Sequence, residues 1–180
     1  DGDGNRIERV DGLGRDTDHE FDPLDRLKRT LDALRPQCPQ GDTYCGKTSF
    51  AYDARDNLRQ VTDAKGLATL YVYDGLSNLD TFTSPATGTT VYTQDAAGNR
   101  LTQRDGREIT TTYSYDALNR LTGTMYPNSA LNTTFYYDAV PADCSASEQF
   151  GKGRLGRMVD SSGETRYCHD RRGNVVRRVQ

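Results

Sequence analysis

The chain has 180 residues, a net charge of −3 and 34% hydrophobic residues, fewer than the roughly 45–50% apolar residues of an ordinary globular domain. No stretch approaches the roughly 18 apolar residues of a membrane-spanning helix, and a mildly acidic chain is poorly suited to nucleic-acid binding, which needs an excess of Lys and Arg. Disorder is disfavoured because the chain contains 11 Tyr and 5 Phe, whereas disordered segments are poor in aromatic residues.

The aromatic residues occur in a repeated step that ends in Asp. In chain order, Asp3 and Phe21-Asp22 open the series. Four segments then follow at a period of 21: Phe50-Ala51-Tyr52-Asp53, Tyr71-Val72-Tyr73-Asp74, Tyr92-Thr93-Gln94-Asp95 and Tyr113-Ser114-Tyr115-Asp116. Phe135-Tyr136-Tyr137-Asp138 comes 22 residues later, and Tyr167-Cys168-His169-Asp170 follows after another 32. Self-similarity at a fixed period indicates a repeat architecture.

Each unit has a second half in which Gly or Asn precedes a short run with β character, as in residues 96–101. An Asp side chain can bind backbone amides two residues on, and Gly or Asn tolerates the left-handed conformation of a tight turn. Each repeat is therefore predicted to be one β-hairpin, with turns at 53–58, 74–79, 95–101 and 116–121. A lone hairpin is marginal in water, so we expect the hairpins to share a sheet. The residues expected to cap the turns are Asp22, Asp53, Asp74, Asp95, Asp116, Asp138 and Asp170.

The aromatic residues are predicted to form a ladder on one face of the sheet. Alternation in Tyr-x-Tyr places both rings on the same side of a strand. We expect these rings to be buried between adjacent repeats and therefore unavailable for stacking on sugars. The ladder comprises Phe50, Tyr52, Tyr71, Tyr73, Tyr92, Tyr113, Tyr115, Phe135, Tyr137 and Tyr167.

This pattern resembles the YD repeats of Rhs (rearrangement hot spot) proteins, which are also found in wall-associated bacterial proteins, insecticidal toxin complexes and teneurins. The resemblance runs from Gly4-Asn5-Arg6-Ile7 to Gly173-Asn174-Val175-Val176, with Gln94 and His169 in place of the second aromatic residue. It implies an all-β fold, in which a spiralling sheet of stacked hairpins of about 21 residues forms a hollow shell. Residues 1–180 would then be a single array of repeats and a fragment of such a wall.

Two segments depart from the period, and both contain cysteine. Loop insertions are expected near 34–48 and 139–153. Cys38 and Cys45 are within reach of each other across a Pro/Gly loop, and Cys144 paired with Cys168 would tie the second insertion to a strand. Disulfides in an exported protein, free buried thiols and a metal site remain alternatives, although no zinc-ligand spacing occurs. Leu24, Leu27, Leu31 and Leu34 follow helical spacing, but the repeat register favours a strand there.

Enzymatic and metal sites are not supported by the sequence. His169-Asp170 has the form of a base with its orienting carboxylate, yet it occupies the Tyr-Asp position of a repeat. Asp1-Gly2-Asp3-Gly4-Asn5 opens like a calcium loop, but Arg6 and Gly12 stand where Gly and Glu are required. We expect no catalytic residue, metal or cofactor. A cluster of basic residues is expected to form a solvated or acid-paired face rather than an anion site: Arg166, Arg171, Arg172, Arg177 and Arg178.

Two functions of different classes follow from the resemblance and the residues. The first is a structural shell segment of a secreted or cell-surface bacterial protein, whose partners are the rest of the shell and an enclosed C-terminal toxin or effector domain. The second is a surface module in which aromatic and Asp side chains bind carbohydrate or a protein of another cell.

Overall fold

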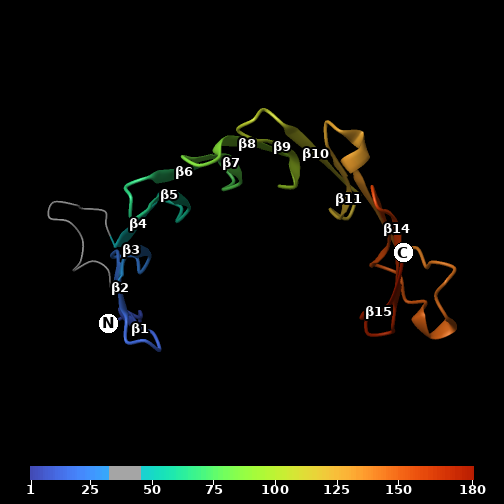
Figure 1. Cartoon of the computed structure of the whole chain (residues 1–180), viewed down its shortest axis with the longest axis horizontal. Coiled ribbons are helices and arrows are strands. Elements are labelled where there is room, and N and C mark those ends of the chain that lie inside the picture. Colours follow the sequence, from blue (N-terminus) through green and yellow to red (C-terminus); the bar gives the residue numbers. More distant parts are fainter. Residues whose placement is uncertain (33–45) are drawn as a thin grey trace. The chain divides into compact units, whose positions relative to one another are not determined.

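The computed structural model describes residues 1–32 and 46–180, and these residues form strands, turns and two single-turn 3₁₀ helices (Figure 1). The helices are η2 (Ser129–Leu131) and η3 (Ala146–Glu148). The strands are β1 (Glu8–Val10), β2 (Asp16–Phe21), β3 (Leu27–Asp32), β4 (Lys47–Tyr52), β5 (Leu58–Thr62), β6 (Ala68–Tyr73), β7 (Leu79–Ser84), β8 (Gly88–Gln94), β9 (Arg100–Arg104), β10 (Thr110–Tyr115), β11 (Leu121–Met125), β12 (Thr133–Tyr137), β13 (Leu155–Asp160), β14 (Gly163–His169) and β15 (Val175–Val179). The prediction of an all-β protein is confirmed.

The strands form one antiparallel sheet in which hydrogen-bonded neighbours follow the order of the sequence. The chain divides into two compact units, residues 1–91 and 92–180, which we describe separately. In the part of the chain that the structure describes, no helix has the length and apolar character needed to cross a membrane.

The hairpin turns lie where the repeat register predicts them. In the first unit, β4 ends at Tyr52 before β5 begins at Leu58, and β6 ends at Tyr73 before β7 begins at Leu79. In the second unit, residues 95–99 join β8 to β9 and residues 116–120 join β10 to β11. The strand prediction after Asp22 is confirmed for Leu27–Asp32, because strand pairing with β2 outweighs the helical spacing of the leucines.

A β-bulge recurs in the hairpins that carry the aromatic–Asp step. Between β4 and β5, Ala51 faces Gln60 while Tyr52 faces Leu58, so Arg59 is an extra residue in its strand. A bulge bends its strand and increases the local twist. These hairpins therefore share a local bend at the same position of the repeat. The same register shift falls between Glu20 and Phe21, Val72 and Tyr73, Ser114 and Tyr115, Tyr136 and Tyr137, and Cys168 and His169.

Strand register places Phe50 and Tyr71 on one face of the first unit, and Tyr113, Phe135 and Tyr167 on one face of the second. Tyr71 faces Phe82 across β6 and β7, and their ring centroids are 5.5 Å apart. Residues directly opposite each other share a face, so Val72 and Thr81 lie on the other side. The ten ladder side chains are half-buried rather than fully buried, since a single-layer sheet exposes each of its faces to solvent.

The described residues hold little fully buried apolar surface. Their buried hydrophobic side chains are Cys144 and Cys168, and the buried polar ones are Thr90, Thr124, Thr165 and His169. Stability must therefore come largely from strand pairing, half-buried ladders and the polar contacts described below.

Most of the predicted 34–48 insertion, including Cys38 and Cys45, lies outside the described residues, but Lys47 and Thr48 already belong to β4. The end of that insertion was therefore set too late, because Lys47 and Thr48 pair with β3. The second insertion lies between β12 and β13 and contains η3.

Candidate functional site: the Asp turns and the insertion beside them

Every aromatic–Asp step except the one at Asp138 opens a five-residue turn in which the Asp carboxylate binds the chain ahead of it. In the turn 95–99, Asp95 Oδ1 accepts the backbone N–H groups of Ala97 and Asn99, both at 2.9 Å. Oδ2 accepts the Asn99 side-chain amide, also at 2.9 Å. The backbone closes the same turn, with Asp95 N–H donating to the Asn99 carbonyl. The carboxylate thus satisfies amides that the bend leaves without a strand partner.

This arrangement recurs along the chain, and we call these segments the Asp turns. Their fifth residue is Asn or Arg, and its side chain binds the carboxylate of the first. The Asp turns are 22–26, 53–57, 74–78, 95–99, 116–120 and 170–174. They follow β2, β4, β6, β8, β10 and β14. In an antiparallel meander, this places the Asp turns of each unit at the same end of the strands.

The fourth residue of an Asp turn takes a positive φ. Asn119 has φ of 59°, Ser77 has 65° and Gly98 has 83°. Left-handed backbone strains residues with a Cβ and suits Gly, with Asn and Asp tolerated best among the others. This requirement explains why the sequence shows Gly, Asn or Asp at that position in most repeats.

In the Asp turns 22–26, 53–57 and 95–99, the fifth residue also reaches the fourth residue of the following Asp turn. Asn57 Nδ2 donates to Ser77 Oγ at 3.0 Å, and Asn99 Nδ2 donates to Asn119 Oδ1 at 2.8 Å. Where the fifth residue is Arg, the link is an ion pair: Arg26 contacts Asp56 at 2.7 Å. Successive repeats are therefore joined through side chains as well as through strand pairing.

Sequence reasoning placed one turn incorrectly and overlooked others. Asp3 was expected to open the first turn, but Asp1 Oδ1 accepts the amides of Asp3 and Asn5. Asp1 precedes Asp22 by 21 residues, which is the period itself. Asp11, Asp63 and Asp105 cap the turns at the opposite ends of the strands. In each, Oδ1 accepts the backbone amides two and four residues further on. The pattern Asp-x-x-Gly in residues 11–14 and 63–66 was the available signal.

The hydrogen bonds keep the turn carboxylates ionised. The pKa of Asp95 is lowered chiefly by the Asn99 side chain, and that of Asp74 by the Asn78 side chain. The pKa of Asp138 falls to about 2, mainly because Arg120 binds it.

Arginine side chains cover rings along the sheet. The Arg26 guanidinium carbon lies 4.8 Å from the Tyr52 ring centroid, and that of Arg100 lies 4.1 Å from Tyr92. Arg120 takes the same position over Tyr137 at 4.5 Å. These cation–π contacts occupy ring faces that a bound sugar would need.

The second insertion interrupts the turn that Asp138 opens. Asp138 follows β12 as expected, but its N–H donates to the Arg154 carbonyl and its Oδ1 accepts from Gly153 N–H at 2.6 Å. Gly153 and Arg154 thus occupy the fourth and fifth turn positions. Arg154 follows Asp138 by 16 positions instead of four, so twelve residues are extra. The repeat resumes at Leu155, which faces Tyr137.

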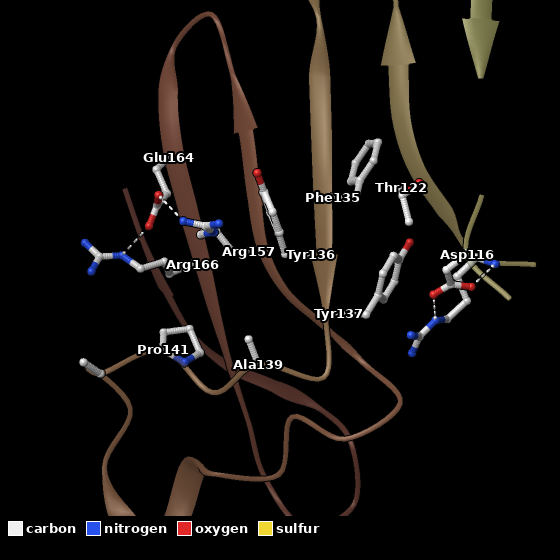
Figure 2. A pocket seen from close by; sticks show the side chains of 12 residues that line it. Asp116, Thr122, Phe135, Tyr136, Tyr137, Ala139, Pro141, Arg157, Glu164 and Arg166 are labelled. Carbon is white, nitrogen blue, oxygen red and sulfur yellow. Dashed lines mark hydrogen bonds and ion pairs between the residues drawn. The ribbon is translucent and has the colours of Figure 1, made fainter. Parts of the chain in front are cut away.

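This insertion, together with β12, β13 and β14, borders an open groove of about 560 Å³ (Figure 2). Figure 2 shows Tyr136 beside Arg157, whose guanidinium carbon lies 3.9 Å from the ring centroid, and Ala139 and Pro141 on the insertion. Arg157 and Arg166 are both paired with Glu164, at 3.1 and 3.6 Å. The groove is therefore mixed in character, with compensated charges and an exposed tyrosine.

The second cysteine pair, the His169-Asp170 step and two arginines of the basic cluster each have defined contacts. Cys144 and Cys168 form a disulfide. His169 is 5% exposed and its Nδ1 has no hydrogen-bond partner, while both Asp170 oxygens bind their own turn; the two do not form a base with its orienting carboxylate. Arg166 and Arg177 are paired with Asp143 and Glu148. Among the described residues, no three His, Cys, Asp or Glu side chains gather as a metal site requires.

Known proteins share this architecture. The RHS Repeat family matches residues 52–90 and 95–130, and no curated protein matches the chain. The Photorhabdus luminescens Tc holotoxin pore, carrying the TccC3 mutation D651A, is similar with a TM-score of 0.62 and 16% identity over 92% of this chain. The crystal structure of TcdB2–TccC3 without its hypervariable C-terminal region is similar with a TM-score of 0.58 and 19% identity over 87% of the chain.

The chain spans 9% of each of these two longer chains, and at such identities the likeness concerns the fold alone. The family match covers the Asp turns 53–57, 74–78, 95–99 and 116–120. Residues 52–90 and 95–130 of this protein are therefore RHS repeats.

Proposed function

We propose that the chain is a wall segment of an RHS-repeat shell that encloses a C-terminal toxin or effector domain of an exported bacterial protein. The observation that carries this proposal is the side-chain linkage between successive Asp turns, exemplified by Asn57 with Ser77 and Asn99 with Asn119. Such linkage joins neighbouring hairpins within each unit, and hydrogen bonding between strands makes the sheet a continuous single layer. A continuous layer is suited to enclosing a volume.

Other features support the same role. The half-buried ladder residues are engaged with strand neighbours, as Tyr71 is with Phe82, and arginines cover several of the rings. The Cys144–Cys168 disulfide is consistent with an oxidising compartment, and hence with a secreted or cell-surface protein. The partners of the segment would be further repeats of the same shell and the enclosed domain.

Protease protection in the complete polypeptide that contains this chain tests the proposal. The enclosed domain should resist digestion in the native protein. It should be digested at least tenfold faster in an Asp95→Ala/Asn99→Ala variant, which removes the cap and link of one turn. Asp80→Ala, at an exposed strand position, is the matched control and should leave protection unchanged. Equal digestion of the domain with and without the wall segment would contradict enclosure.

Carbohydrate binding is the second candidate, and one observation favours it. Tyr136 is 40% exposed and borders the groove. A glycan array probed with the 180-residue chain tests this function. Binding that Tyr136→Ala abolishes without lowering Tm would support it. Loss of binding with Tyr73→Ala instead would assign it to the ladder, and no binding to any glycan would reject the carbohydrate function.

A further inference from the structure

Residues 139–153, which we call the strap, lie over the face of the sheet opposite to the ladder. Cys168 faces Arg177 and alternates with Tyr167 along β14, so the two residues lie on opposite sides of the strand. Cys144 of the strap is bonded to Cys168. Asp143 and Glu148 of the strap pair with Arg166 and Arg177 at 2.5 and 3.1 Å.

We propose that the Cys144–Cys168 disulfide is a redox lock on this strap, opened by a dithiol reductant. The lock does not depend on enclosure of an effector, because it concerns residues within this chain. When the bond is reduced, the strap separates from β14 and uncovers Cys168 and His169, which are 1% and 5% exposed.

The non-covalent contacts of the strap are weak by comparison. The Arg166–Asp143 side chains are 34% and 38% exposed, and those of Arg177 and Glu148 are 45% and 16% exposed. Ion pairs with this much solvent contribute little to stability. Val140 and Phe150 are 41% and 40% exposed, so apolar packing does not anchor the strap either. Backbone groups of the strap also make contacts, since Phe150 N–H donates to the His169 carbonyl and Arg177 Nη1 donates to the Asp143 carbonyl at 3.0 Å. The disulfide is the one covalent restraint among these described contacts.

The reaction is a thiol–disulfide exchange. Cys144 is 6% exposed, so attack requires a local fluctuation that exposes its Sγ while the bond still holds the strap on β14. One thiolate of the reductant attacks Cys144 Sγ, the S–S bond breaks, and Cys168 leaves with the electron pair and takes up a proton. The second thiol of the reductant then attacks the mixed disulfide and releases Cys144 as a thiol. The reductant departs as a disulfide, having supplied two electrons and two protons.

Hydrogen–deuterium exchange of the 180-residue chain, with and without excess dithiothreitol, tests the lock. The amides of Glu148 and Phe150 donate to Ser145 and His169 carbonyls, so a peptide spanning 141–150 reports strap closure. Its exchange should become at least tenfold faster on reduction, while a peptide spanning 116–125 should not change. The same acceleration is expected in a Cys38→Ser/Cys45→Ser variant. That result would assign the effect to Cys144 and Cys168.

A Cys144→Ser/Cys168→Ser variant should exchange at the fast rate whether or not reductant is present. If that variant does not fold, the oxidised and reduced native chains still decide the question, with alkylation mapping to record the state of each cysteine. Equal exchange of residues 141–150 in both redox states would overturn the proposal. Alkylation of Cys144 and Cys168 before any reductant is added would do so as well.

Discussion

The Asn99 side-chain amide donates a hydrogen bond of 2.8 Å to Asn119, a residue of the next Asp turn. The same amide also binds Asp95 in its own turn. One side chain thereby stabilises a turn and ties it to its neighbour, which makes the two turns energetically dependent on each other.

Asn99→Ala is expected to destabilise the chain by about 1–2 kcal/mol, since it removes both bonds. Asn119→Gly keeps the left-handed backbone while removing the second partner. A double-mutant cycle of these two changes, followed by chemical denaturation, should give a coupling of about 0.5–1 kcal/mol. Asn174→Ala, which removes a bond to Asp170, serves for comparison. Additive effects of Asn99 and Asn119 would show that the turns are independent.

Loss of an Asp cap should lower thermal stability. Asp95→Ala leaves the amides of Ala97 and Asn99 without their acceptor, and we expect Tm to fall by about 2–4 °C for a chain of this length. Asp74→Ala should behave alike, and Asp80→Ala should leave Tm unchanged. An unaltered Tm in both turn variants would mean that the carboxylates are not structural.

Acid should destabilise the protein because folding lowers the pKa of Asp11 and Asp138. The pKa of Asp11 and of Asp138 each fall from 3.8 to about 2 in the folded chain. The unfolded chain therefore binds these protons at a higher pH, and the stabilisation is complete above pH 3.8 and lost as the pH falls towards 2. Tm measured between pH 6 and pH 2 should decline across this window. Asp138→Asn should decline less, and parallel curves would argue against a contribution from Asp138.

Substitution by Ala should destabilise the chain at Gly66 but not at Gly75. Gly66 has φ of 79°, so Gly66→Ala should cost about 1–2 kcal/mol. Gly75 is not among the residues with positive φ, and an added Cβ there would meet no atom within 4 Å. Gly75→Ala should therefore be neutral or stabilising by up to about 1 kcal/mol. Denaturant melts of the two variants compare them directly; similar costs would place the strain elsewhere.

The repeats were readable from the sequence because their causes are local. The aromatic alternation, the Asp cap and the Gly or Asn at the fourth turn position each act within a few residues, and the period of 21 repeats them in register. This was enough to predict the all-β class and the four hairpin turns. The confusion of Asp3 with Asp1 shows the limit, since both have the right residue type and differ in position by two.

Contacts between repeats required the tertiary structure. Nothing local indicates that Asn57 reaches Ser77, that a bulge inserts Arg59 into β5, or that Arg120 covers Tyr137. The Cys144–Cys168 bond joins positions 24 residues apart, and its partners were a choice among several until the strands were placed. The sequence determined the turn chemistry because hydrogen bonds within five residues decide it. The pairing of distant side chains depends on strand register, which many residues set together.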